Sequence, residues 1–318
     1  MSHEISVMAD GRKAMAYAGA VPWHGLGQQL EQGASIETWA EASGLDIELT
    51  EGPVYAETSS GYRELEGKKI IVRGDTNEPL AVVGNRYKVV QPIQVLDFFK
   101  RYVGQSAHIE TAGLLFGGRQ YWAMSRLDGE INIAGDIVHP FLLLNSSCDG
   151  KSATTARLTS VRVVCQNTLS AAQGSVAAVK VRHNQDFCGE ELANELGEHY
   201  QSLKAHELML KTLANIKVNH KQAEVFIKRL FDKVTATNLD EVKMSRGGTR
   251  VHELFLGDGI GMGMTATKGT AYGLVQSVTE YFDHEYGRLQ DRRLSKAWFG
   301  KNAVIKEQFA EELLKEAA

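Results

Sequence analysis

The stretch RVVCQNTL, which begins at Arg162, places a guanidinium, a thiol and an amide in what otherwise reads as a buried strand. Strand alternation sends Val161 and Val163 to one face and Arg162 to the other. A buried arginine must meet a carboxylate or an anion, because an isolated charge is costly away from water. Arginine serves both purposes, so an internal ion pair and a phosphate-holding groove both stay open.

Two further residues of this stretch carry polar or reactive groups. Asn167 can cap a short helix predicted over CQNTLSAAQG, and the start of such a helix would also attract phosphate. Cys165 fits a small buried hydrophobe, because a nucleophilic thiolate needs a nearby base that the sequence does not show. The stretch therefore predicts an anion contact more readily than a catalytic centre.

The segment from Lys151 to Gln185 contains no Asp or Glu, although several basic residues lie in it. Such a segment predicts an anion-facing surface, while the alternative is a β-rich core in which acids are simply scarce. Aromatic side chains elsewhere, including Tyr121, could stack on bases. The residues predicted to bind nucleic acid are Lys151, Arg157, Arg162, Asn167, Lys180, Arg182, Trp122 and Trp298.

Other chemistry-bearing motifs are incomplete. His24 in PWHGLG has no matching partner, and Glu280 with His284 shares a helix face but lacks a third metal ligand. The loop GDGIGMGMTATKGT lacks the spacing of a nucleotide-binding P-loop. Three cysteines form no CxxC pair. The sequence therefore predicts no cofactor, no metal site and no catalytic residue.

The elements that would position these residues follow from periodicity and turn chemistry. Ser35 and Gly44 bracket a helix over 36–43, and Pro92 begins a helix over 92–103. Glycine and aspartate turns separate strand-like runs, and long helical periodicity begins after Asp186. The predicted fold class is α+β: a central, mainly antiparallel sheet with interposed helices, followed by a mainly helical C-terminal region. The predicted domains are 1–185 and 186–318.

Composition narrows the class of protein. The chain has 318 residues, 43% hydrophobic residues and a formal net charge of −4, as expected for a globular protein with a substantial core. No apolar run approaches the length of a membrane-spanning helix, and the amino terminus has no signal-peptide pattern. We therefore expect a cytoplasmic protein that has no membrane contact.

Several motifs together resemble a phage/plasmid-like protein family that is catalogued as a domain of unknown function. They are PWHGLG, VVGNRYKVVQ, CDGK, RVVCQNTL and GTAYGLVQSVTEYFDH, and they span most of the chain. The sequence departs from the family pattern at Cys148, where the family usually carries histidine, and at Lys151, where it usually carries serine. The resemblance implies a mobile-element protein and no established activity.

Three functions follow. The first is single-stranded-DNA binding in mobile-element DNA metabolism, with annealing and recombination as its setting; the order of hairpins, strands and helices is similar to that of phage annealing proteins. The second is a protein-partner or antidefence factor, in which the C-terminal helices supply a partner or homo-oligomer surface. The third is an enzyme on a nucleic acid or phosphorylated ligand, built from Asp149, Arg162, Cys165 and His24.

Overall fold

The protein is described by a computed structural model that covers residues 5–19, 21–22, 25–103, 108–162, 168–170, 178–198, 201–232, 242–287 and 290–317. The chain folds into two compact units that interleave along the sequence. Unit 1 comprises residues 1–128, 141–157 and 178–199, and unit 2 comprises 129–140, 158–177 and 200–318. The boundary near Gln185 between two successive domains stays a prediction.

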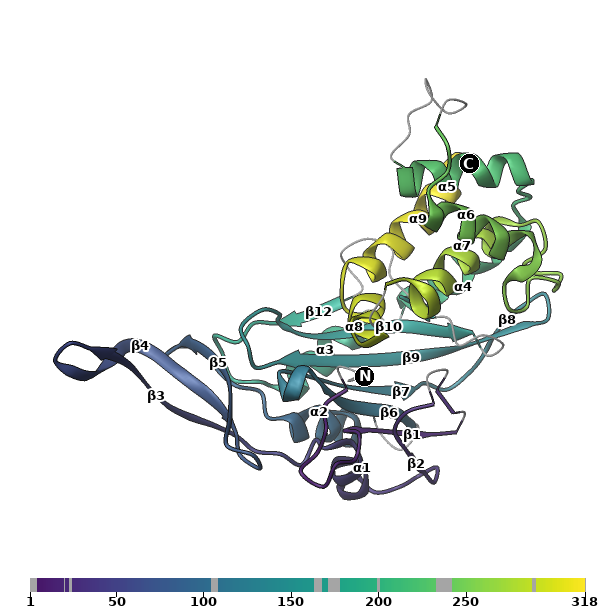
Figure 1. The fold of residues 1–318 in the computed structure, drawn as a ribbon. Coiled ribbons are helices and arrows are strands. Elements are labelled where there is room, and N and C mark those ends of the chain that lie inside the picture. The colour runs from purple at the N-terminus through teal and green to yellow at the C-terminus, as the bar shows by residue number, and fades with distance from the viewer. Residues whose placement is uncertain are drawn as a thin grey trace. The chain divides into compact units, whose positions relative to one another are not determined.

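A mainly antiparallel sheet forms the framework of the fold (Figure 1). Its hydrogen-bonded order is β11-β10-β9-β7-β6-β1-β2, with β12 paired to β10 and β8 paired to β9. Only the pairing of β1 with β2 is parallel among the described strands. The strands are β1 (Met15–Ala18), β2 (Gln28–Leu30), β6 (His108–Leu115), β7 (Gln120–Arg126), β8 (Ile131–Ile133), β9 (Asp136–Ser147), β10 (Thr154–Arg162), β11 (Thr168–Ser170) and β12 (Ala178–Val181).

The helices of unit 1 begin and end where local chemistry satisfies their backbone groups. The Ser35 hydroxyl accepts from Thr38 N at the start of α1 (Ile36–Ser43), and Gly44 ends it with φ of 75°. Gln91 and Gln94 form a capping box on α2 (Pro92–Phe98), which continues as the π-helix η1 (Phe99–Val103). The other helices of this unit that the structure describes are the short 3-10 helix η2 (Phe116–Gly118) and α3 (Gly189–Glu198).

A second sheet of unit 1 contains β3 (Leu49–Thr58), β4 (Gly61–Arg73) and β5 (Glu78–Gly84) in that order. Antiparallel pairing of β3 with β4 continues to Thr58 and Gly61, while β5 pairs with β4 only from Lys68 onward. The outer part of the hairpin is therefore a two-stranded ribbon. This ribbon, residues 54–66, projects from the sheet in Figure 1, and we call it the arm.

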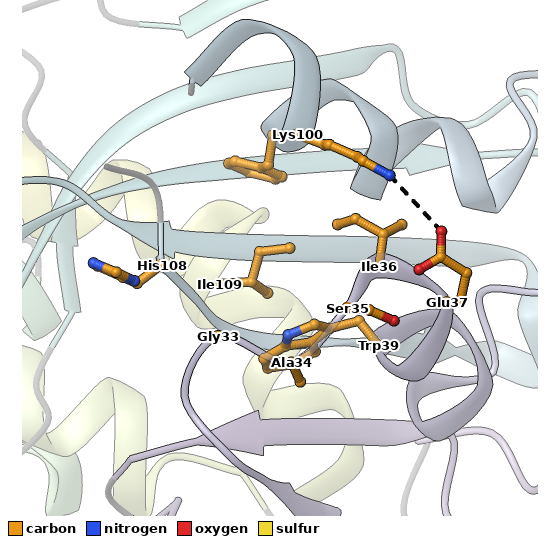
Figure 2. A pocket seen from close by; sticks show the side chains of 10 residues that line it. Gly33, Ala34, Ser35, Ile36, Glu37, Trp39, Lys100, His108 and Ile109 are labelled. Atoms are coloured by element: carbon orange, nitrogen blue, oxygen red, sulfur yellow. Dashed lines mark ion pairs between the residues drawn. The ribbon is translucent and has the colours of Figure 1, made fainter. Parts of the chain in front are cut away.

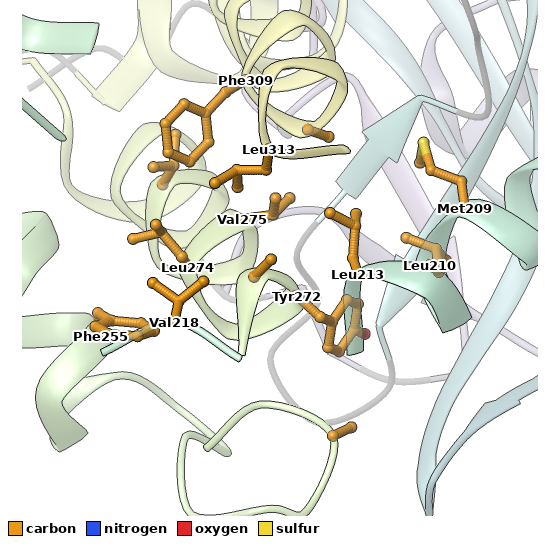
Figure 3. Close-up of a cluster of buried hydrophobic side chains, with 14 of the residues drawn as sticks. Met209, Leu210, Leu213, Val218, Phe255, Tyr272, Leu274, Val275, Phe309 and Leu313 are labelled. Carbon is orange, nitrogen blue, oxygen red and sulfur yellow. The ribbon is translucent and has the colours of Figure 1, made fainter. Parts of the chain in front are cut away.

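Unit 2 is organised around a helix that is buried along its whole length. All ten residues of α7 (Ala271–Glu280) are buried. Apolar side chains of α7, among them Val275, meet those of the surrounding helices, among them Leu213 and Phe309, in the cluster of Figure 3. The other helices are α4 (Gln201–Asn215), α5 (His220–Asp232), α6 (Arg246–Glu253), the π-helices η4 (Leu254–Asp258) and η5 (Tyr281–Glu285), α8 (Gln290–Trp298) and α9 (Lys301–Ala317).

The glycine-rich segment before α7 is part of this packing. Both carboxylate oxygens of Glu280 accept from Ile260 N, and Glu280 is buried. A Cβ on Gly273 would lie 2.0 Å from the Thr267 carbonyl oxygen, so only glycine fits there without a shift. The glycines therefore allow close packing of a loop against a helix.

These observations confirm the predicted α+β fold class, the helix over 36–43 and the helical C-terminal region. The hairpin around Gly117 is also confirmed, because β6 and β7 pair on either side of it. The short helix predicted over CQNTLSAAQG is wrong at Thr168–Ser170, which forms strand β11. These residues pair with 159–161 of β10, and this ladder satisfies backbone groups that a helix would have satisfied internally.

No helix in the described ranges is both long enough and apolar enough to cross a lipid bilayer.

Candidate nucleic-acid interface

The site is built on the pairing of β10 with β12 in unit 1. Thr155 lies opposite Lys180, and Arg157 lies opposite Ala178. Directly opposed residues of an antiparallel pair share a face, as do residues two apart on one strand. Arg157 and Lys180 therefore lie on the same face of the sheet, while Ala156 and Val179 turn to the other face and are buried.

Arg182 follows β12 directly and lies two positions beyond Lys180. Both side chains are exposed, and Arg157 is partly exposed. Within the part of the chain that the structure describes, Lys180 and Arg182 form no ion pair. We call Arg157, Lys180 and Arg182 the cationic face.

The end of β12 is fixed by His183. Its ring stacks on Tyr87 with centroids 4.6 Å apart, and its Nδ1 donates to the Lys88 carbonyl oxygen at 2.9 Å. Its Nε2 lies 3.5 Å from the Thr154 hydroxyl, which in turn meets Ser146 at 2.7 Å. Burial lowers the pKa of His183, so the ring is neutral at pH 7. Its contacts with Tyr87, Lys88 and Thr154 hold the end of β12 in place.

Lys151 lies in the turn between β9 and β10, where its ammonium pairs with Asp149 at 3.3 Å. Its side chain is 81% exposed, against 14% for Asp149. An exposed ion pair of this kind contributes little to stability, so Lys151 remains accessible to an anion. Asp149 partly offsets the charge of Lys151, which would therefore attract an anion less strongly than an unpaired lysine would.

Two predicted contacts, Arg162 and Asn167, lie in part or wholly outside the described residues. Arg162 is the last residue of β10, and its side chain lies outside the described residues. Asn167 lies outside them as well, together with His24 and Cys165. Thr168–Ser170, which directly follow Asn167 and were predicted to be helical, form strand β11.

The predicted stacking residues do not form a platform on this face. Trp122 is fully buried, with its ring against Gly113 of β6, where an added Cβ would lie 2.6 Å from the indole. Tyr121 is also fully buried. No base can stack on either ring, so the prediction that Trp122 and Tyr121 stack on bases is wrong. Trp298 lies on α8 in unit 2, half-buried, with its ring 6.2 Å from that of Phe299.

The thiol beside the turn does not suit nucleophilic chemistry. Cys148 is buried, and its Sγ lies 3.8 Å from the Gly118 carbonyl oxygen. Burial, and to a lesser extent Asp149, raises the pKa of Cys148 to about 12. The group is therefore a protonated thiol at neutral pH, which is a poor nucleophile.

The candidate metal pair has a structural role instead. Glu280 holds the Ile260 amide, and the residues described contain no cluster of three or more His, Cys, Asp or Glu side chains suited to a metal ion. Asp283, which lies between Glu280 and His284 in the sequence, forms a buried ion pair with Lys306 at 2.6 Å.

Unit 1 also contains a pocket of about 370 Å³ between α1, η1 and β6 (Figure 2). Its apolar lining includes Ile36 and Ile109, and Lys100 faces Glu37 at 3.7 Å across it. None of the residues predicted to bind nucleic acid lines it. The lining suits a small amphipathic molecule and does not by itself specify a reaction.

Two features of the site went unpredicted from the sequence. The stacked pair of Tyr87 and His183 joins residues 96 positions apart, so no local pattern could reveal it. The arm was also missed, although Ser59-Ser60-Gly61 between Thr58 and Tyr62 is a turn signal.

The fold is that of an α+β protein built on a mainly antiparallel sheet, with a cationic face on two adjoining strands. Residues 79–298, more than half of the chain, match the family described as a domain of unknown function, DUF932, and the chain belongs to that family. This confirms the expected membership of a family catalogued as a domain of unknown function. No curated protein and no solved structure matches the chain.

Proposed function

We propose that this protein binds single-stranded DNA through the cationic face of unit 1, as a cytoplasmic mobile-element protein of DNA metabolism. The observation that supports the proposal is the register of β10 and β12, which puts Arg157 and Lys180 on one face. Arg182 extends this row, and the surrounding segment 151–185 contains no carboxylate. Cations gathered on one face of two adjoining strands suit the spaced phosphates of a nucleic acid.

Binding at this face depends mainly on phosphate contacts. Trp122 and Tyr121 are buried, so base stacking on them does not contribute. We therefore expect little sequence preference and a strong dependence on salt. With roughly three or four cations engaged, the logarithm of the binding constant falls with the logarithm of salt concentration at a slope of about −2 to −3.

Fluorescence anisotropy with a labelled oligonucleotide tests the proposal. We expect the double variant Lys180→Glu, Arg182→Glu to lose most of the affinity, and wild-type affinity to fall between about 50 mM and about 200 mM salt. The control is Lys204→Glu, Lys221→Glu, which makes the same charge change at exposed positions on α4 and α5. An equal loss of affinity in both double variants would contradict a binding face on β10 and β12.

A protein-partner or antidefence role is the second candidate, and the arm favours it. Residues 55–66 are all exposed, and they include Tyr55 and Tyr62 at 57% and 75% exposure. Exposed aromatic side chains on a projecting ribbon are typical of surfaces that bind another protein. Copurification from the native host, with and without Tyr55→Ser and Tyr62→Ser, tests this role.

A further inference from the structure

The arm, residues 54–66 at the outer end of the β3–β4 hairpin, lacks the packing that normally stabilises a sheet. Its two strands pair only with each other, because β5 joins β4 from Lys68 onward. Every residue from Tyr55 to Glu66 is exposed. An isolated two-stranded hairpin is at best marginally stable in water, so the arm gains most from a partner that covers it.

The two faces of the arm differ in chemistry. Tyr55 lies opposite Glu64, and Glu57 lies opposite Tyr62, so these four side chains share one face, the tyrosine face. The other face carries Ala56 and, opposite it, Arg63.

The arm is also acidic, since its only charged groups are three carboxylates (Glu57, Glu64 and Glu66) and one guanidinium (Arg63). That charge balance does not suit DNA.

The arm does not invite strand addition at its edges. A bulge interrupts the register between Pro53 and Tyr55, and charged side chains recur along both strands. Proline, bulges and charges are devices that disfavour edge-to-edge pairing of strands. A partner would therefore contact a face of the arm, and the tyrosine face presents most of its aromatic area.

We propose that the tyrosine face of the arm docks on the cationic face of a second copy of this chain. The two surfaces are complementary in charge, since Glu57 and Glu64 would meet Lys180 and Arg182. Arginine also stacks favourably on tyrosine rings. Both surfaces are built on two adjacent antiparallel strands, so their side chains repeat at the same spacing.

A contact within one chain does not satisfy this pairing. Figure 1 shows the tip of the arm at one end of unit 1, well separated from β10 and β12. The arm and the cationic face are different surfaces, so two copies can exchange arms in a closed dimer, or each copy can dock on the next head-to-tail. A head-to-tail contact leaves one arm and one cationic face available at each step, and it generates rings or open chains of copies.

Sedimentation velocity over a range of protein concentrations, without nucleic acid, tests this inference. We expect the wild-type protein to sediment faster as its concentration rises, and this association to weaken with added salt. The variant Tyr55→Ser, Tyr62→Ser, in which both exposed rings are lost, is expected to remain a monomer. A matched control is Leu208→Ser, at an apolar side chain on α4 that is 67% exposed. A monomeric wild type, or dissociation by Leu208→Ser alone, would overturn the proposal.

Charge exchange gives a sharper test. Glu57→Lys with Glu64→Lys, and Lys180→Glu with Arg182→Glu, should each abolish self-association. Mixing the two double variants should restore association, because the altered arm then meets the altered face, and the unaltered arm of the second variant meets the unaltered cationic face of the first. The control Glu31→Lys, Glu195→Lys makes the same charge change at exposed positions outside both surfaces. Failure of the mixture to associate would count against direct contact between the arm and the cationic face.

Oligonucleotide binding separates this inference from the proposed function, with which it shares the cationic face. Tyr55→Ser, Tyr62→Ser should bind the oligonucleotide with wild-type affinity while remaining a monomer. A protein that associates through the arm and binds no oligonucleotide would retain this inference and refute the DNA proposal. Wild-type protein that binds oligonucleotide and never associates would do the reverse.

Discussion

The cationic face of unit 1 and the helical core of unit 2 use charged side chains in different ways. Lys180 and Arg182 are exposed at the end of β12, where solvent screens their charge. In unit 2, Lys306 and Asp283 are 1% and 4% exposed and lie 2.6 Å apart. Charges of the first kind contribute little to folding, whereas charges of the second kind must be matched for the fold to form. Removing these charges should therefore lower the free energy of unfolding much more in unit 2 than in unit 1.

The largest expected effect is at the buried ion pair. Lys306→Met removes the cation facing Asp283 inside unit 2, and we expect a loss of about 3–5 kcal/mol in the free energy of unfolding. Urea denaturation followed by circular dichroism measures this loss, and hydrogen exchange of α9 locates it. The double variant Lys306→Met, Asp283→Leu removes both charges and should recover most of the stability. A double variant as unstable as the single one would contradict this explanation.

The next effect concerns pH and His206. This ring is buried in unit 2, its Nε2 lies 2.8 Å from the Ser160 hydroxyl, and burial lowers its pKa from 6.5 to about 4. Between these values the unfolded chain binds a proton that the folded chain does not. The contribution of His206 to the free energy of unfolding is therefore fully present above pH 6.5. It is lost as the pH falls toward 4, and the loss reaches about 3 kcal/mol.

The variant His206→Gln keeps a hydrogen-bonding side chain and removes the titration. Unfolding free energies measured across this pH range should then vary less than those of the wild type. An unchanged slope in the variant would assign the pH dependence to other groups.

A smaller loss of stability is expected where the loop before α7 packs against that helix. Gly273→Ala forces the helix and the Thr267 carbonyl apart, because the new Cβ would lie 2.0 Å from that oxygen. We expect a loss of about 1–3 kcal/mol, measured as a shift in the urea midpoint. Gly263→Ala is the control, since a Cβ there meets no atom within 4 Å. Equal shifts in the two variants would mean that the close approach at Gly273 is unimportant.

The smallest effect on stability is expected at the cationic face. Lys180→Ala with Arg182→Ala removes exposed charges that form no ion pair in the described structure, and the unfolding free energy should change by no more than about 0.5 kcal/mol. The same variant should weaken oligonucleotide binding. A large loss of stability would instead mean that Lys180 and Arg182 stabilise unit 1. The proposed difference between the two units would then be wrong.

Local elements were predictable because their signals are local. Ser35 and Gly44 set the ends of α1, and Gly117 marks the hairpin of β6 and β7. The prediction failed at Thr168–Ser170, where the helical preference of CQNTLSAAQG was outweighed by pairing with β10. Trp122 was misassigned because exposure depends on what packs over a ring, in this case β6 at Gly113.

By itself, the sequence determined the α+β class, the family and the acid-free basic segment, since periodicity, motifs and charge are properties of the chain read in order. Only the tertiary structure decided which cations share a face. Strand register places Lys180 beside Thr155 and Arg157, and that register depends on hydrogen bonds between segments distant in sequence. The stacking of His183 on Tyr87 also depends on a contact between distant segments, which no local pattern encodes. The exposure of the arm likewise depends on what packs against it among the described residues.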